Sequence, residues 1–158
     1  MNYENDLYIS WDEFQDRCVM LAHTIRKQGH DFDKILCVTR GGIFPTGIIS
    51  RELNIKRIEN VGIEAYGGPK GQSLKAPKFL KDAHPEFLEN ALVIEDLVDT
   101  GSTLKFLKPH TKNCYFVAVF AKPEGADQLD MYQKAVPQDT WVRFPWDTRR
   151  RYVDPIVK

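Results

Sequence analysis

The sequence has few cysteines and no excess charge of either sign. Its three cysteines, Cys18, Cys37 and Cys114, are odd in number and widely spaced. Such a set forms neither a disulfide framework nor a zinc site, and it suits a reducing compartment. Because 22 basic residues balance 22 acidic residues, the chain has no global positive field that would attract nucleic acid. A highly anionic ligand would therefore need local positive charge or a metal ion.

Long hydrophobic runs and the common nucleotide-binding motifs are also absent. No apolar segment reaches the roughly 18 residues of a membrane span. Asp6, Asp12 and Glu13 interrupt any N-terminal apolar region, so we expect no signal peptide and a cytoplasmic location. Neither Gly-x-Gly-x-x-Gly nor Gly-Lys-Ser/Thr occurs, which argues against a Rossmann turn and a P-loop. At 158 residues the chain fits a single domain, residues 1–158.

One segment combines a buried strand, two acids and a turn of small residues. Ala91–Ile94 is a short apolar run typical of a fully buried strand, and Glu95 and Asp96 follow it. The string Asp99-Thr100-Gly101-Ser102-Thr103 comes next and leads into a predicted helix. Such a turn offers backbone N–H groups to an anion, and ligands bind beyond the carboxyl ends of strands in open α/β sheets. The segment predicts acids for sugar hydroxyls or Mg²⁺ beside a phosphate cradle; the alternative is a strand–turn–helix junction with a chance acidic cluster.

Apolar periodicity predicts alternating helices and strands along most of the chain. Ser10 and Glu13 form a capping-box pattern at the start of an amphipathic helix that ends near Gly29. Further helices are expected from Pro45 and from Leu104. The predicted strands are 35–38, 57–66, 91–94 and 115–121, with a strand-like piece in 136–147.

The pattern stops between residues 67 and 86. This stretch contains several glycines and prolines together with Lys70, Lys75, Lys78 and Lys81. A structureless stretch of about 20 residues inside a compact domain usually means a lid or disorder. We expect a flexible loop that closes over an anionic substrate, against the alternative of a surface loop whose lysines only keep it soluble.

Two basic residues follow predicted strands at the same edge of the sheet. Arg40, in Thr39-Arg40-Gly41-Gly42, has a forked guanidinium suited to phosphate. Lys122 follows the strand 115–121 and is a candidate donor to a ligand oxygen. Each has a plainer interpretation as a solvated side chain in an ordinary loop.

The last forty residues are rich in aromatic residues and proline. Trp141 and Trp146 are either core residues of a small subdomain or a surface that stacks on a planar ring. The run Arg149–Arg151 is predicted to be a solvated or subunit-contact surface. Contact with phosphate or with an anionic membrane surface is the lesser alternative.

Together these residues resemble type I phosphoribosyltransferases, in particular the xanthine-guanine phosphoribosyltransferases of bacterial purine salvage. The resemblance rests on 39–42, on 95–101, on Phe120-Ala121-Lys122-Pro123-Glu124-Gly125 and on Pro137-Gln138-Asp139-Thr140-Trp141-Val142. It implies a parallel sheet flanked by helices, with a core of about 1–122 that carries the mobile loop, and a C-terminal hood of about 123–158. It also implies transfer of phosphoribose from phosphoribosyl pyrophosphate (PRPP) to N9 of a 6-oxopurine, with Mg²⁺.

The resemblance assigns PRPP to the first half of the site. It implies that Arg40 and Gly41 hold pyrophosphate. Glu95 and Asp96 would hold the ribose hydroxyls, with Asp96 on the metal side. The turn that would bind the 5′-phosphate consists of Thr100, Gly101, Ser102 and Thr103.

The purine is assigned to the second half. Asp99 would lie near N7 as the catalytic general base and Lys122 would donate to the 6-oxygen. Trp141 would stack on the base and Val142 would contact its edge. Asp147 would lie near the second position of the base or at a second metal.

The sequence departs from the family pattern in three ways. Glu95 stands where the familiar bacterial enzyme has Asp, Ser102 replaces a second Gly, and the loop carries lysines where the family has an arginine. A hypoxanthine-preferring enzyme and a non-catalytic regulator that binds nucleotides or RNA are the alternatives. A homo-oligomer, either a tetramer or a dimer, and a weak peripheral membrane association are further expectations.

Overall fold

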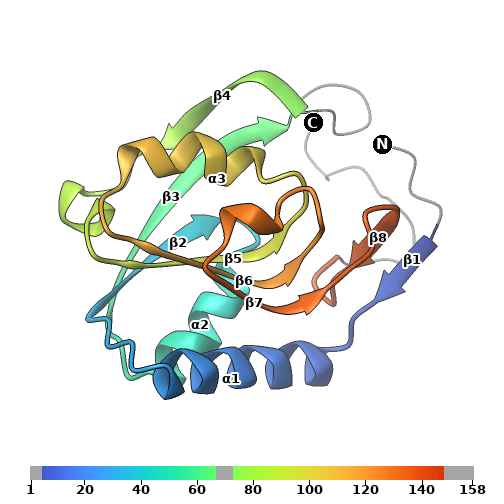
Figure 1. Ribbon diagram of the computed structural model, residues 1–158, viewed down its shortest axis with the longest axis horizontal. Coiled ribbons are helices and arrows are strands. Elements are labelled where there is room, and N and C mark those ends of the chain that lie inside the picture. Colours follow the sequence, from blue (N-terminus) through green and yellow to red (C-terminus); the bar gives the residue numbers. More distant parts are fainter. Residues whose placement is uncertain (1–4, 67–72, 148–158) are drawn as a thin grey trace.

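A six-stranded sheet lies at the centre of the molecule (Figure 1). The computed structural model describes residues 5–66 and 73–147 of the chain. The strand order is β4-β3-β2-β5-β6-β7, and all neighbours are parallel except β3 and β4. The predicted α/β class is confirmed. The strands of this sheet are β2 (Lys34–Thr39), β3 (Arg57–Tyr66), β4 (Ser73–Lys81), β5 (Leu92–Val98), β6 (Tyr115–Ala121) and β7 (Met131–Ala135).

Helices cover both faces of the sheet (Figure 1). The helix α1 (Trp11–Lys27) begins as predicted, because the Ser10 side chain accepts a hydrogen bond of 3.1 Å from the backbone N–H of Glu13. No helix in the described part of the chain is long and apolar enough to cross a membrane. The other helices are α2 (Ile43–Glu52), α3 (Ser102–Leu107) and the short 3₁₀ turns η2 (Pro85–Leu88), η3 (Lys108–His110) and η4 (Ala126–Gln128).

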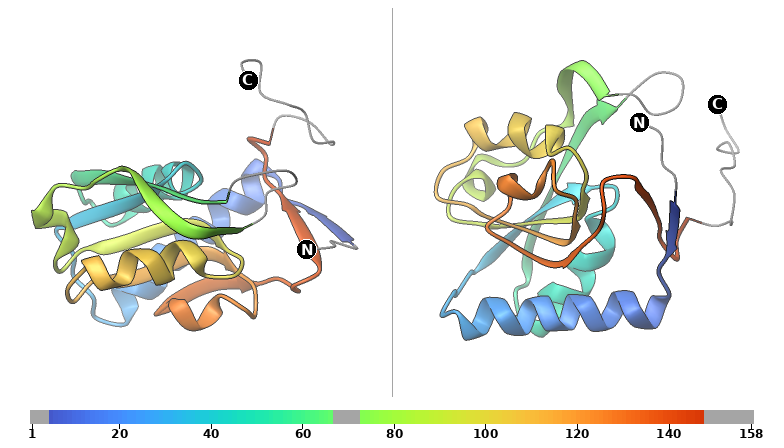
Figure 2. Two further views of the ribbon diagram at one scale, coloured as in Figure 1. Left: turned by 90° about the horizontal axis from the view of Figure 1, so that it is seen from above. Right: turned by 45° about the vertical axis from the view of Figure 1, so that its right-hand side comes forward.

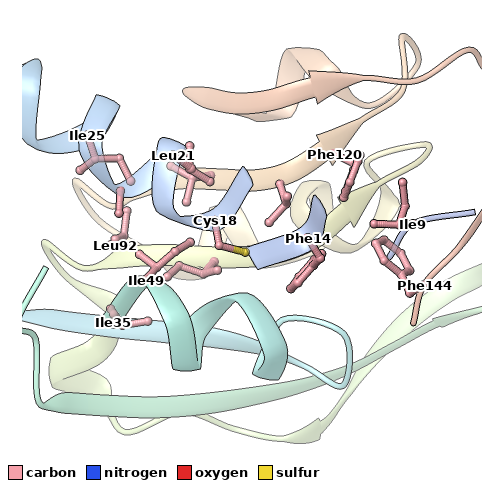
Figure 3. Packing of buried hydrophobic residues seen from close by; sticks show 14 of the residues in the cluster. Ile9, Phe14, Cys18, Leu21, Ile25, Ile35, Ile49, Leu92, Phe120 and Phe144 are labelled. Carbon is pink, nitrogen blue, oxygen red and sulfur yellow. The ribbon is translucent and has the colours of Figure 1, made fainter. Parts of the chain in front are cut away.

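Alternating side chains of the strands supply two cores. In β2, Ile35 belongs to the cluster that includes α1 and α2, whereas Leu36 belongs to the cluster under α3. Figure 3 shows the first cluster, in which Phe14 and Leu21 of α1 lie over the sheet. Because both faces are covered, the strands read as continuous apolar runs in the sequence.

The two ends of the described chain form a small separate sheet. Its strands, β1 (Asn5–Tyr8) and β8 (Thr140–Arg143), pair in parallel and stand beside the main sheet (Figure 2). We call this two-stranded sheet, the turn 138–139 directly before β8 and residues 144–147 the hood. Since β7 still belongs to the main sheet, the predicted core boundary near residue 122 is too early.

The prediction of a structureless stretch over 67–86 is wrong from residue 73 onwards. Residues 73–81 form β4, which pairs antiparallel with β3, and 85–88 form η2. Two of the loop lysines make exposed cross-hairpin ion pairs of 2.9 Å, Lys78 with Glu64 and Lys81 with Glu59. Lys70 and the rest of 67–72 lie outside the described residues.

A stack of aromatic rings joins the hood to α2. The Trp146 ring lies between Phe44 of α2 and Phe144, with centroid distances of 4.0 and 4.5 Å and interplanar angles of 8° and 5°. Phe14 of α1 meets Trp146 edge-on at 4.8 Å. Of the two predicted alternatives for Trp146, a core residue is therefore correct.

We predict that Trp146→Ala lowers the free energy of unfolding by about 3 kcal/mol, because it empties the space between two stacked rings. Trp11→Ala is the graded comparison: the Trp11 ring also lies against Phe44 and Trp146, with centroids 6.0 and 5.8 Å away, but it is tilted and 52% exposed, so its loss should cost less, about 1 kcal/mol. Urea denaturation followed by circular dichroism measures both values. Equal losses in the two variants would contradict a structural role for the stack.

Candidate active site

Three adjacent parallel strands have their carboxyl ends on the same side of the sheet, and a predicted site residue directly follows each of them. The strands β2, β5 and β6 are parallel neighbours, and the residues after their last positions are Arg40, Asp99 and Lys122. A pocket of about 320 Å³ opens at these carboxyl ends. The predicted site residues that line it are Glu95, Asp96, Asp99, Gly101, Ser102, Thr103, Lys122, Trp141 and Val142.

An ion pair in the pocket links the loop after β5 to the loop after β6. Nζ of Lys122 donates to Oδ2 of Asp99 at 2.9 Å, and the Lys122 side chain is only 1% exposed. The other carboxylate oxygen, Oδ1, accepts a hydrogen bond of 2.7 Å from Nε2 of Gln138. Burying a charge is costly unless it is paired and hydrogen-bonded, and Asp99 provides that pairing for Lys122.

The predicted phosphate turn is built around a glycine in the left-handed region. Gly101 has φ of 74°, and a Cβ there would lie 2.8 Å from Cγ of Gln128. The turn also has an internal hydroxyl contact of 3.2 Å, from Oγ1 of Thr100 to Oγ of Ser102. A residue other than glycine would therefore strain the turn and displace it from the loop that follows β6.

The pyrophosphate loop predicted at Arg40 and Gly41 lies against the acidic pair. A Cβ on Gly41 would lie 2.3 Å from the carboxylate atoms of Asp96, so a larger residue there would push this carboxylate aside. The peptide bond between Thr39 and Arg40 is cis. Arg40 is exposed, and neither Arg40 nor Gly41 is among the residues that line the pocket.

The hood closes the pocket on its other side. Trp141 of β8 is 41% exposed and lines the pocket, whereas the next residue, Val142, is buried. Asp147 is exposed, and its Oδ2 accepts a hydrogen bond of 3.0 Å from the backbone N–H of Phe144. Asp147 is not among the pocket-lining residues, although its charge acts on Asp96 as described below.

Comparison with known proteins shows which family the chain belongs to. The family model described as a phosphoribosyl transferase domain matches residues 10–152. The chain belongs to the phosphoribosyltransferase family. The predicted resemblance is thereby confirmed.

Two curated relatives and one solved structure show how similar this chain is to known proteins in sequence and in fold. The xanthine-guanine phosphoribosyltransferase of Idiomarina loihiensis is 36% identical, over 96% of this chain and 93% of its own. That of Chromohalobacter salexigens is 35% identical, over 98% of this chain and 92% of its own. The crystal structure of a purine phosphoribosyltransferase from Pyrococcus horikoshii has a TM-score of 0.73 at 22% identity, covering 96% of this chain and 99% of that one. The last of these shows the shared fold.

In this phosphoribosyltransferase the acidic pair resists ionisation. Burial raises the pKa of Glu95 well above its usual range, and the charge of Asp96 raises it further. Burial likewise raises the pKa of Asp96 to about 6, with a further rise from Asp147, against a lowering by the backbone N–H groups of Leu97 and Asp96. A bound cation, or hydroxyl groups that donate hydrogen bonds, would stabilise the ionised form of both carboxyl groups.

The same pair of carboxyl groups would suit a magnesium ion that bound phosphate groups also held. In the described residues, no three His, Cys, Asp or Glu side chains form a metal-binding cluster. Mg²⁺ in phosphate-binding sites keeps several waters and uses only one or two carboxylates together with substrate phosphates. Two adjacent carboxyl groups facing one pocket are consistent with such a partial ligand set.

Sequence reasoning did not single out Gln138. This residue contacts Asp99 across 39 positions of sequence. It stands inside the string 137–142 that carried the family resemblance. A neutral amide has neither charge nor metal-ligand spacing, so only its place in that string could have drawn attention to it.

We predict that Asp96→Asn stabilises the ligand-free protein at pH 7.5. The pKa of Asp96 in the folded state lies above its unfolded value, so the associated stability is present below about pH 4 and is lost as the pH rises through about 6. Removing this ionisation should add up to about 3 kcal/mol, and less to the extent that solvent screens the half-buried group. The gain should vanish near pH 4. Urea denaturation in the presence of a chelator at several pH values measures it.

The matched control is Asp82→Asn, at an exposed position away from the pocket. This variant should follow the wild-type pH dependence. An Asp96→Asn protein that is no more stable than the wild type at pH 7.5 would contradict the cost that burial assigns to this carboxylate.

Proposed function

We propose that this phosphoribosyltransferase transfers the 5-phosphoribosyl group of PRPP to N9 of a 6-oxopurine, releasing pyrophosphate. The observation that carries the proposal is one pocket that joins an acidic pair, a glycine-centred turn and a lysine beside a tryptophan. The curated relatives are named for xanthine and guanine, so we propose these two bases as substrates, and hypoxanthine with them. The products would be XMP, GMP and IMP.

The turn and the acidic pair would hold PRPP. The N–H groups and hydroxyls of 100–103 suit the 5′-phosphate, and Glu95 and Asp96 suit the ribose hydroxyls. Gly41, which lies against Asp96, and its neighbour Arg40 would take the pyrophosphate. Mg²⁺ held in part by Asp96 would supply charge neutralisation of the leaving pyrophosphate. Positive character develops on the ribose as its bond to pyrophosphate breaks, so placement and charge stabilisation would provide most of the rate.

The loops and the hood would hold the base. The Lys122 ammonium can only donate hydrogen bonds, which favours a 6-oxo group and opposes the 6-amino group of adenine. Trp141 would stack on the ring, and the Val142 backbone would contact its edge. Asp99, next to Lys122, would accept the purine proton as general base. Asp147 would act near the second position of the base or at a second metal.

Two alternatives make different predictions. A hypoxanthine-preferring enzyme differs only in the ranking of the bases. A non-catalytic regulator would bind nucleotides or RNA in a salt-dependent way without turnover, and the intact set of Asp99, Lys122 and Trp141 argues against it. Cytoplasmic location, a dimer or tetramer, and membrane contact by Arg149–Arg151, which lies outside the described residues, stay predictions.

A panel of purines tests the proposal. With PRPP and Mg²⁺ we expect nucleotide formation from guanine, xanthine and hypoxanthine, and none from adenine. Excess EDTA should abolish the reaction, and added Mg²⁺ should restore it. Chromatographic separation of nucleotides measures all of these results. Comparable rates with adenine and guanine would contradict the role of Lys122, and no nucleotide from any base would contradict the proposed function.

Asp99→Asn tests the general base. The amide keeps the shape of the carboxylate and still accepts a hydrogen bond from Lys122, but it takes up no proton, and its NH₂ group then faces the Nε2 donor of Gln138. We expect kcat to fall by about 10²–10⁴-fold, with little change in the KM for PRPP. Asp127→Asn, an exposed substitution in η4, is the control. Full turnover by the Asp99 variant would remove this residue from the proton transfer.

A further inference from the structure

The side chain of Gln138 joins the hood to the loops after β5 and β6. Its Nε2 donates to Oδ1 of Asp99 at 2.7 Å, and its Oε1 accepts a hydrogen bond of 3.1 Å from the backbone N–H of Glu124. Gln138 is half-buried and lies two residues before β8 begins at Thr140. The amide of Gln138 therefore connects three segments next to the proposed purine site: the loop after β5, the loop after β6 and the turn before β8.

The chemistry of its partners fixes the orientation of this amide. A carboxylate only accepts hydrogen bonds and a backbone N–H only donates them. A flipped amide would place its oxygen against Asp99 and its NH₂ group against the N–H of Glu124, and would lose both hydrogen bonds. The contact to Asp99 is thus directional, and it requires an amide donor at that end.

The contact completes the restraint of the Asp99 carboxylate. Lys122 holds one oxygen, Oδ2, and Gln138 holds the other, Oδ1. A lysine ammonium is a point charge on a flexible stem, so the Lys122 contact fixes the position of one oxygen and sets no direction for the other. With both oxygens held, the plane itself is set.

We propose that Gln138 is a positioning residue for the phosphoribosyl transfer proposed above, and the inference rests on that function. It holds the Asp99 carboxylate in place when the Lys122 ammonium turns to the 6-oxygen of the purine. It also ties the alignment of Asp99 to the hood, because Gln138 lies only three residues before Trp141. Small misplacements of a reacting group reduce rates strongly.

The test compares Gln138→Leu and Gln138→Glu with Gln133→Leu and Gln133→Glu. Gln133 lies on β7, and its Nε2 makes a long contact of 3.9 Å to Sδ of Met20. Gln138→Leu removes both hydrogen bonds. Gln138→Glu keeps an acceptor for the N–H of Glu124 but places a carboxylate against that of Asp99. The charged groups in contact there are Asp99 and Lys122, and the Glu124 side chain is exposed.

We expect kcat with guanine to fall about 10- to 100-fold in Gln138→Leu, while the KM for PRPP stays within about twofold. Gln138→Glu should be impaired to a similar degree at pH 8 and should recover towards pH 6, because two facing carboxylates then share a proton. The Gln133 variants should match the wild type throughout. Thermal unfolding of every variant confirms that each one folds.

If Gln138 served only the folding of the protein, the activities of the variants would differ from those expected above. If Gln138 only anchored the N–H of Glu124, Gln138→Glu would keep that bond and turn over like the wild type at pH 8. That result, or a Gln138→Leu enzyme with wild-type kcat, would overturn the proposal. Should Gln138→Leu fail to fold, the pH dependence of Gln138→Glu decides alone.

A second measurement separates this proposal from the proposed function. Carbon NMR of the ligand-free protein at pH 8 follows the chemical shift of the Asp99 carboxyl carbon without any turnover. This signal should move in Gln138→Leu, which removes the hydrogen bond to Oδ1, and should not move in Gln133→Leu. A wild-type protein that forms no nucleotide refutes the proposed function and the catalytic purpose of Gln138 together, even where NMR shows the contact. An active wild type whose Asp99 carbon signal ignores Gln138→Leu refutes the Gln138 proposal alone.

Discussion

The buried ion pair between Lys122 and Asp99 is the interaction on which the site depends. Lys122 is almost wholly enclosed at the end of β6, where an unpaired ammonium would be strongly unfavourable. Asp99 offsets that cost from the end of the neighbouring strand β5. Because each residue directly follows its strand, the register of the parallel pair sets the position of both charges. The pairing of β5 with β6 thus fixes the part of the pocket that Asp99 and Lys122 line.

The acidic pair on the other side of the pocket is held at a cost to stability. Glu95 and Asp96 are placed where burial raises the pKa of both carboxyl groups, and Gly41 packs against Asp96 so closely that a Cβ at position 41 would displace the Asp96 carboxylate. Such an arrangement is unfavourable in the ligand-free protein at neutral pH. Substrate hydroxyls and a cation would relieve it, so part of the folding free energy is exchanged for readiness to bind.

Local patterns in the sequence were sufficient for the central strands, the cap of α1 and most of the pocket. The β5 segment carried its chemistry and its apolar run within a few residues, so both could be read together. The strand β4 was missed because Pro77 and its lysines resemble a loop, although edge strands tolerate both. The strand β1 pairs with β8 at the far end of the chain, and no local pattern carries that partnership. The contact of Gln138 with Asp99 is equally non-local, and its neutral amide gives no chemical signal.

Two independent contacts make the hood part of the site. The Trp146 ring is held between Phe144 and Phe44, and Phe44 lies in the first turn of α2, directly after the Arg40–Gly42 loop. At the other end, Gln138 bonds to Asp99. Between these anchors the chain carries Trp141 and Val142, which line the pocket. A shift of the hood would therefore move the aromatic wall of the pocket, the restraint on Asp99 and the helix behind the predicted pyrophosphate loop together. This linkage follows from packing that connects the hood with α2 and with the loop after β5, and it joins the part of the pocket proposed for the purine to the loop proposed for pyrophosphate.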